Sequence, residues 1–266
     1  MTEPASRTAE QRAVVAAFQA LTLIPLALLG LDLVGVNWSP TVVWTVLGPS
    51  ILVAFTLQAP SAGRWRPIEL GDLAAAAALA LFAIVSLLEW NVHTDYVFHW
   101  GTKAKRFALV GGLDLDFLVR PWNEHAHPDY PNGLPATLAA FAITGGGTRW
   151  LPVALLSTVH LGLLLLAARE LAARMGAGLV GRTTALGVVA WGTMAFGVGF
   201  RQAGGADLPL AAAVVAGTAI LAGPLDRRSD REIAWSGARA AVRKLGGMVV
   251  AALLGAVDSA RRGGGG

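Results

Sequence analysis

A carboxylate and three cations follow one another in the stretch DYVFHWGTKAKRF, which begins at Asp95. If this stretch is helical, Lys103, Lys105 and Arg106 lie about two to three turns beyond the acid. A carboxylate can take the proton of an attacking hydroxyl group, and nearby cations can neutralise a phosphate leaving group. The alternative is a solvated loop with ordinary surface charges and snorkelling lysines, which composition alone favours.

A second carboxylate, Asp207, lies in the stretch RQAGGADLPLA, and Arg201 precedes it. The pattern of apolar runs and basic connectors puts Asp207 at the start of the sixth span, at the same membrane face as Asp95. Two acids and several cations then converge on one surface. The sequence therefore predicts one polar centre built from two distant segments.

The stretch HAHPDYPNGLP contains His125, His127 and Asp129 at alternate positions. In an extended segment alternate side chains share one face, which is how some metallohydrolases gather their ligands. However, Pro128 and Pro131 interrupt any regular strand, and a third histidine ligand would have to come from elsewhere. A zinc site is therefore not the favoured interpretation.

Two further patterns have simpler explanations. The stretch GAGLVG at 176–181 fits the dinucleotide pattern GxGxxG, but it joins two apolar helices instead of following a strand, so we interpret it as a turn. His160 lies in the middle of an apolar run, where an ionisable group is a functional candidate by default. A neutral imidazole bonded to a neighbouring helix is the favoured interpretation.

Composition identifies the solvent of the elements that must position these residues. The chain has 266 residues, of which 55% are hydrophobic and 14% are charged, and its mean hydropathy is +0.57. Soluble domains are more polar, so we expect an all-α polytopic bundle in a membrane and no nucleic-acid partner. The apolar runs predict about six spans, at 13–35, 41–58, 71–88, 150–168, 183–200 and 206–223.

The apolar stretch Leu134 to Thr144 is too short to span. If it lies on the membrane surface, the basic connectors between the spans all face the cytoplasm. We therefore predict juxtamembrane helices within a large external loop, with Trp100 and Phe107 among lipid headgroups and Lys103 and Arg106 on a shared polar face. The N-terminus is then cytoplasmic, in a multi-pass protein of the plasma membrane.

Four regions follow from these patterns. Residues 1–88 hold three spans, 89–149 form the external loop, 150–223 hold three further spans, and 224–266 form a basic cytoplasmic tail that we expect to be poorly ordered. The tail ends in RRGGGG, and its change of character leads us to expect a truncated or frame-shifted end.

Three stretches, in this order and spacing, resemble a known superfamily: DYVFHWGTKAKRF, HPDYPNGLP and GGADLPLA. They are similar to the integral-membrane C-type glycosyltransferases, which include dolichyl-phosphate-mannose protein mannosyltransferases and aminoarabinose transferases. The likeness covers about residues 85–223. The chain departs from the family in having fewer spans, two extra spans before the loop, and a single acid where an acidic pair is usual.

The resemblance implies roles for particular residues. Asp95 matches the acid that serves as catalytic base or binds a metal, and Asp207 matches the second acid, so both are candidate ligands of Mg²⁺ or Mn²⁺. His127 and Pro128 match the element that shapes the donor pocket, and Tyr130 and Pro131 continue it. The implied substrate-binding residues are Lys103, Lys105, Arg106, His127, Asp129, Tyr130 and Arg201.

The expected function is inverting transfer of a hexose or pentose from a polyprenyl-phosphate donor to an acceptor at the outer membrane face. Membrane lipid and this donor are the expected partners. One alternative is a non-catalytic or truncated membrane scaffold. A second is a transporter or flippase, which would need ionisable residues near the middle of its spans.

Overall fold

The computed structural model describes residues 9–58, 67–88, 92–127, 130–145, 150–196 and 203–221. Within these ranges the chain is helical, apart from loops and one isolated bridge between Val92 and Ala203. The prediction of an all-α membrane protein is confirmed. The helices are α1 Ala9–Leu33, α2 Pro40–Gln58, α3 Leu70–Leu87, η1 Tyr96–Trp100, α4 Gly101–Val110, α5 Leu115–Leu118, η2 Pro121–Ala126, α6 Gly133–Thr144, α7 Trp150–Arg174, α8 Leu179–Phe196 and α9 Asp207–Leu221.

A helix forms at each of the six positions predicted to span. Among the described residues, α1, α2, α3 and α7 are long and apolar enough to cross a bilayer. α9 has 15 residues up to Leu221, the last residue that the structure describes. α8 carries Arg182, Thr183 and Thr184 in its first turns. In the described part of the chain, four of the six predicted positions thus hold candidate spans, and α8 and α9 both run to the last residue of a described range.

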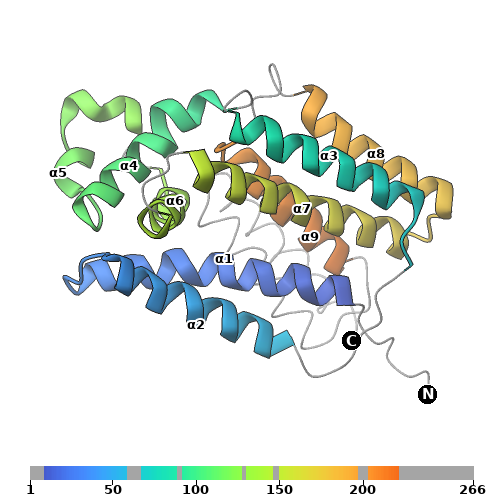
Figure 1. Ribbon diagram of the computed structural model, residues 1–266, viewed down its shortest axis with the longest axis horizontal. Helices are drawn as coiled ribbons and strands as arrows, with labels where there is room; N and C mark the ends of the chain where they lie inside the picture. The colour runs from blue at the N-terminus through green and yellow to red at the C-terminus, as the bar shows by residue number, and fades with distance from the viewer. Residues whose placement is uncertain are drawn as a thin grey trace, which may run out of the picture.

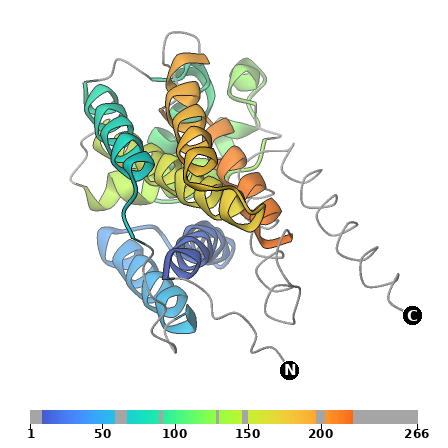
Figure 2. The same cartoon turned by 90° about the vertical axis from the view of Figure 1, so that its right-hand side faces the viewer.

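The bundle consists of two groups of helices, which Figures 1 and 2 show from perpendicular directions. α1 and α2 form an antiparallel pair on one side. α3, α7, α8 and α9 form the other group, in which α7 is central because it packs against α3, α8 and α9 and also reaches α1. The large loop between α3 and α7 folds over one end of both groups.

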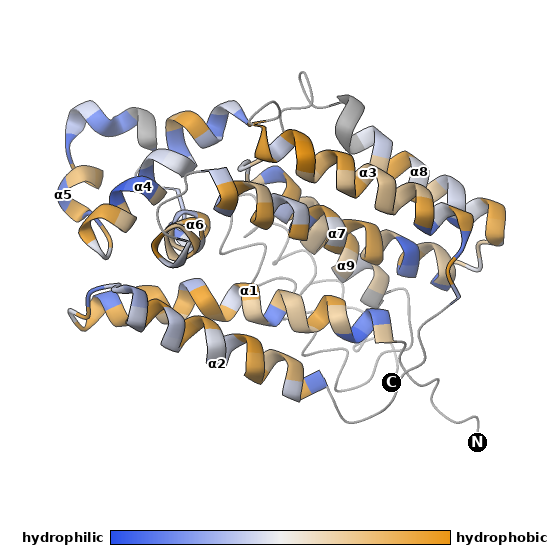
Figure 3. Cartoon of the chain, viewed as in Figure 1, coloured by the Kyte–Doolittle hydropathy of each residue, from blue (hydrophilic) through white to orange (hydrophobic). Residues whose placement is uncertain are grey.

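At the end of the bundle away from the α3–α7 loop, α1 and α7 are longer than the apolar runs predicted. The added turns carry charged residues, which are blue in Figure 3. α1 begins at residue 9 and α7 continues to residue 174. The helices continue because acids and arginines of four helices satisfy one another there. The pairs are Arg169 with Glu10 at 3.3 Å and with Asp72 at 2.9 Å, Arg174 with Glu170, and Arg182 with Glu69 at 2.6 Å.

α6 lies across the bundle, seen end-on in Figure 1, and packs against α1, α2, α4 and α7. Its small residues Ala136, Ala139 and Ala140 are spaced three and four apart, which puts them on one face, and all three are fully buried. They belong to a second core at this end, together with Trp38, Phe107 and Leu118. A helix too short to span thus joins the loop to the α1–α2 pair.

The predicted basic tail 224–266 and the connector that contains Arg64 and Arg66 lie outside the described residues.

Candidate functional site

Two segments that are far apart in sequence meet at the loop end of the bundle. Val92 and Ala203 form a parallel bridge, and the backbone N–H of His93 donates to the carbonyl of Ala203 at 2.9 Å. The backbone N–H of Gly204 donates to Oγ of Ser157 on α7, also at 2.9 Å. Segments 92–96 and 203–207 are therefore attached to each other and to the central helix.

Two glycines, Gly204 and Gly101, leave room for the side chain of Tyr96. A Cβ atom at Gly204 would lie 2.5 Å from Cδ2 of Tyr96, and a Cβ at Gly101 would lie 2.7 Å from its Cζ. Gly204 also has φ of +82°, a left-handed conformation that only glycine adopts readily. The first glycine of GGAD, Gly204, is thus explained by the close approach of the Tyr96 ring, and a Cβ at the second, Gly205, would lie 3.0 Å from Cγ of His93.

Asp95 and Asp207 consequently lie at the same end of the fold. The side chain of Asp95 is 40% exposed, and its Oδ2 lies 3.9 Å from Nδ1 of His93. That nitrogen accepts a hydrogen bond from the Asp95 backbone N–H at 3.0 Å. Asp207 is exposed in the first turn of α9, where the helix dipole favours a carboxylate.

Lys103 is fully buried, so the prediction that it shares a polar face with Arg106 is wrong. Its ammonium group donates to the backbone carbonyl of His127 and, at 3.3 Å, to that of Tyr130. The predicted location of Trp100 and Phe107 among headgroups is also wrong, because their exposed fractions are 1% and 0%. α4 turns its apolar face toward the protein, and Lys103 binds the following loop to it.

Arg106 holds the outer part of the loop. Its Nε donates to Oδ2 of Asp114 at 2.7 Å, and the other oxygen of Asp114 accepts the backbone N–H of Phe117 at 2.9 Å, capping α5. Of the three cations that follow Asp95, two therefore have structural partners. Lys105 is exposed, and its side chain lines a cavity.

An aromatic stack contains both predicted residues of the HPDYP element that the structure describes. The ring of His127 stacks on Tyr130 at 4.5 Å, and Tyr130 stacks on Trp100 at 5.6 Å. The His99 ring meets His127 edge-on at 4.4 Å. His127 has φ of +47°, and the Lys103 bond to its carbonyl helps to hold this conformation. The side chains of His125, Pro128, Asp129 and Arg201 lie outside the described residues.

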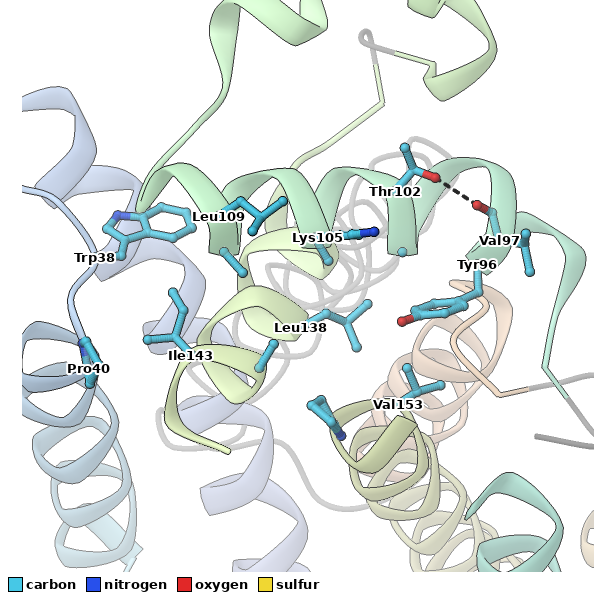
Figure 4. Close-up of a pocket in the computed structure, with 15 residues that line it drawn as sticks. Trp38, Pro40, Tyr96, Val97, Thr102, Lys105, Leu109, Leu138, Ile143 and Val153 are labelled. Atoms are coloured by element: carbon cyan, nitrogen blue, oxygen red, sulfur yellow. Dashed lines mark hydrogen bonds between the residues drawn. The ribbon is translucent and has the colours of Figure 1, made fainter. Parts of the chain in front are cut away.

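The cavity has a volume of about 710 Å³ and lies between α4, α6 and the start of α7. Figure 4 shows the Tyr96 hydroxyl directed into it, with Thr102 and Lys105 on α4 above. The remainder of the lining is mostly apolar. It includes Trp38, Pro40, Leu109, Leu138, Ile143 and Val153.

Trp38 and Pro40 come from the α1–α2 pair and were not predicted to belong to the site. The Trp38 backbone N–H donates to the carbonyl of Gly111 at 2.6 Å, and its Nε1 donates to the carbonyl of Leu28 at 3.0 Å. These bonds fix the loop between α1 and α2 against the end of α4. The sequence shows a Trp and a Pro between two apolar runs, which is common in any membrane hairpin and does not indicate this contact.

Two predicted features remain: the histidine in the middle of α7 and the candidate metal ligands. His160 is fully buried, and its Nδ1 lies 2.6 Å from the carbonyl of Leu156, one turn earlier in the same helix. Within the described ranges, no group of three or more histidine, aspartate or glutamate side chains could hold a metal ion.

Comparisons of the chain with known protein families, curated proteins and solved structures find no match.

Proposed function

We propose that the protein is a membrane glycosyltransferase, which moves a hexose or pentose from a polyprenyl-phosphate donor to an acceptor outside the cell. One observation carries the proposal: the segment bearing Asp95 is bonded to the segment bearing Asp207, beside a cavity that combines apolar walls with Lys105. The proposal places the protein in the plasma membrane with its N-terminus in the cytoplasm and the α3–α7 loop outside.

The cavity suits an anionic amphiphile. Its volume of about 710 Å³ falls in the range of roughly 300–1,000 Å³ that is typical of ligand pockets. The part near Trp38, Pro40 and Ile143 offers hydrocarbon contacts for the first isoprene units. The part near Tyr96 and Lys105 offers a hydroxyl and a cation for the phosphate. The sugar would then extend toward Asp95, the residue adjacent to Tyr96.

In the proposed reaction Asp95 takes the proton of the acceptor hydroxyl. The acceptor oxygen forms a bond to the anomeric carbon as the bond from that carbon to the phosphate oxygen breaks. The electron pair of the broken bond stays on the polyprenyl phosphate. Because the oxygen attacks from the opposite side, the configuration at the anomeric carbon inverts. Lys105 stabilises the departing phosphate, since a cation aimed at developing charge lowers the barrier.

The other predicted cations act on the loop. Lys103 fixes the carbonyls of His127 and Tyr130, so in this proposal it positions the aromatic stack that borders the sugar. Arg106 maintains the fold of the loop through Asp114. The roles of Asp129 and Arg201 in binding the substrate remain proposals from the sequence.

The proposal includes a divalent cation held by the two carboxylates. Mg²⁺ takes oxygen ligands and is usually held by one or two carboxylates together with water and substrate phosphate. Asp95 and Asp207, from adjacent segments, provide such a pair without a third protein ligand. A bound Mg²⁺ or Mn²⁺ would neutralise phosphate charge.

The test is transfer of labelled sugar by full-length protein in liposomes, with polyprenyl-phosphate-linked hexoses and pentoses as donors. We expect Asp95→Asn to reduce transfer by about 10²–10⁴-fold, the usual contribution of a general base. Asp116→Asn is the matched control, because Asp116 is an exposed acid on α5. Undiminished transfer by folded Asp95→Asn would refute the assigned role, and no transfer by the unaltered protein from any such donor would favour a scaffold.

A further inference from the structure

The tip of the loop exposes large apolar side chains on a rigid turn. Leu115, Val119 and Trp122 are 59%, 76% and 71% exposed. We name these three residues the 115–122 patch. They are spaced four and three positions apart, and the intervening Leu118 is buried in the second core. One side of this short segment thus faces the protein while the other presents apolar groups outward.

Hydrogen bonds hold the segment that carries the patch in a defined conformation. Asp114 caps α5 through Phe117 and is bound by Arg106. The side-chain amide of Asn123 donates to the Phe117 carbonyl at 2.9 Å. These bonds cross the segment on both sides of Val119, so the chain is held with its apolar groups outward. In water such an arrangement is unfavourable, because apolar side chains gain free energy when they are removed from water.

Other exposed apolar side chains lie at the same end of the bundle as the patch. Leu109 and Val110 at the end of α4 are 68% and 45% exposed. Leu109 and Pro40 line the same cavity, and Trp44, one turn into α2, is 59% exposed. α2 is one of the four helices fit to span the bilayer. Exposed apolar side chains therefore occur on a span, at the end of α4 and on α5.

The charges at the patch match the interfacial region of a bilayer. The guanidinium of Arg120 lies over the Trp122 ring, 5.7 Å from its centroid. Tryptophan is enriched at the headgroup level of membranes, and an arginine beside it can reach lipid phosphate while its stem remains in the apolar layer. A protein partner would explain the apolar groups equally well, but lipid is favoured because the patch lies at the end of a bundle in which α2 is fit to span a bilayer and itself exposes apolar side chains.

From this geometry we propose that the 115–122 patch inserts into the headgroup region of the leaflet at the loop end of the bundle. Leu115, Val119 and Trp122 enter the upper acyl layer, and Arg120 binds phosphate. The loop is thereby anchored at a fixed depth beside the cavity, whatever chemistry the cavity performs.

The chain has no cysteine, so single cysteines can carry a spin label without competing thiols. We would label Val119→Cys and Trp122→Cys in the full-length protein, with Asp116→Cys as the matched control on an exposed polar side of α5. Each variant is reconstituted into vesicles of phosphatidylcholine and phosphatidylglycerol, with a polar nickel chelate on both faces. Accessibility to oxygen and to the chelate then reports the depth of each label.

We expect labels at 119 and 122 to be more accessible to oxygen than to the chelate, and the label at 116 to show the reverse. Equal access of the chelate to all three labels would overturn the proposal, because the patch would then face water. Shielding of 119 and 122 from both reagents would also overturn it and would indicate a protein partner. Two patch positions are used so that a local disturbance at one does not decide the result.

Discussion

Replacement of Gly204 by alanine tests the contact that brings the two acidic segments together. The added Cβ would lie 2.5 Å from Cδ2 and 2.6 Å from Cγ of Tyr96, distances at which one group must move. The backbone at φ +82° adds about 1–2 kcal/mol of strain for any residue with a Cβ. Overpacking adds about 1–3 kcal/mol. We therefore expect a loss of unfolding free energy of about 2–5 kcal/mol.

Gly35→Ala is the matched control. Gly35 has φ of +76°, but a Cβ there would meet no atom within 4 Å. It should therefore lose only the strain of about 1–2 kcal/mol. The difference between the two variants measures the contact with Tyr96, separately from the backbone conformation.

The free energy of unfolding is measured in mild detergent by adding denaturant, with near-ultraviolet circular dichroism as the signal. Sugar transfer is measured separately in liposomes. Because the strain can be relieved by moving segment 203–207 away from Tyr96, we expect Gly204→Ala to lose transfer at temperatures where it is still folded. Tyr96→Ala should remove most of the added stability cost in the double variant, since the clashing ring is absent. Equal unfolding free energies for Gly204→Ala and Gly35→Ala would refute the close contact between Gly204 and the Tyr96 ring.

Three further changes follow from the charged groups. Lys105→Gln should raise the KM for a polyprenyl-phosphate donor by about tenfold or more, measured against Arg182→Gln at the opposite end of the bundle, because Lys105 is the exposed lysine of the cavity lining; an unchanged KM would contradict its role. Lys103→Met should cost about 1–3 kcal/mol of unfolding free energy by leaving two buried carbonyls without this donor, and stability equal to that of the unaltered protein would contradict the assigned bonds. Arg169→Ala should cost about 3 kcal/mol, the low end for a broken buried ion pair, because its partner Asp72 is 20% exposed; a loss below that of Arg120→Ala would show that the pairs do not stabilise the bundle.

Hydropathy predicted the helices well because the period and length of apolar runs are local properties. It also predicted that Asp95 and Asp207 lie at the same end of the bundle, because the number of membrane crossings between two residues determines whether they lie on the same side. The extent of α1 and α7 was less predictable. Their added turns depend on Arg169 finding Glu10 and Asp72, and such partners are identified only after the helices are packed.

The face that α4 buries could not be read from its sequence. Trp100 and Phe107 suit a membrane interface as well as a protein core, and Lys103 suits a headgroup as well as a pair of carbonyls. The choice depends on α6, whose small residues allow α4 to come close, and on loop carbonyls that point inward. The cavity was missed for the same reason, because Trp38 reaches it only through a contact with Gly111 at the end of α4.

The two ends of the bundle hold charge in different ways, and this difference supports a reactive role for Asp95. At the end with Glu10 and Asp72, an arginine lies within ion-pair distance of each acid, which stabilises packing. At the loop end, Arg106 is bound to Asp114, and Lys103 donates to backbone carbonyls. Two of the three cations that follow Asp95 are thus engaged elsewhere, and Nδ1 of His93, which lies nearest to its carboxylate, already accepts a hydrogen bond from the Asp95 backbone N–H. A half-exposed carboxylate held in this way remains open to an incoming hydroxyl group, which a carboxylate bound in a bidentate arginine pair would not be.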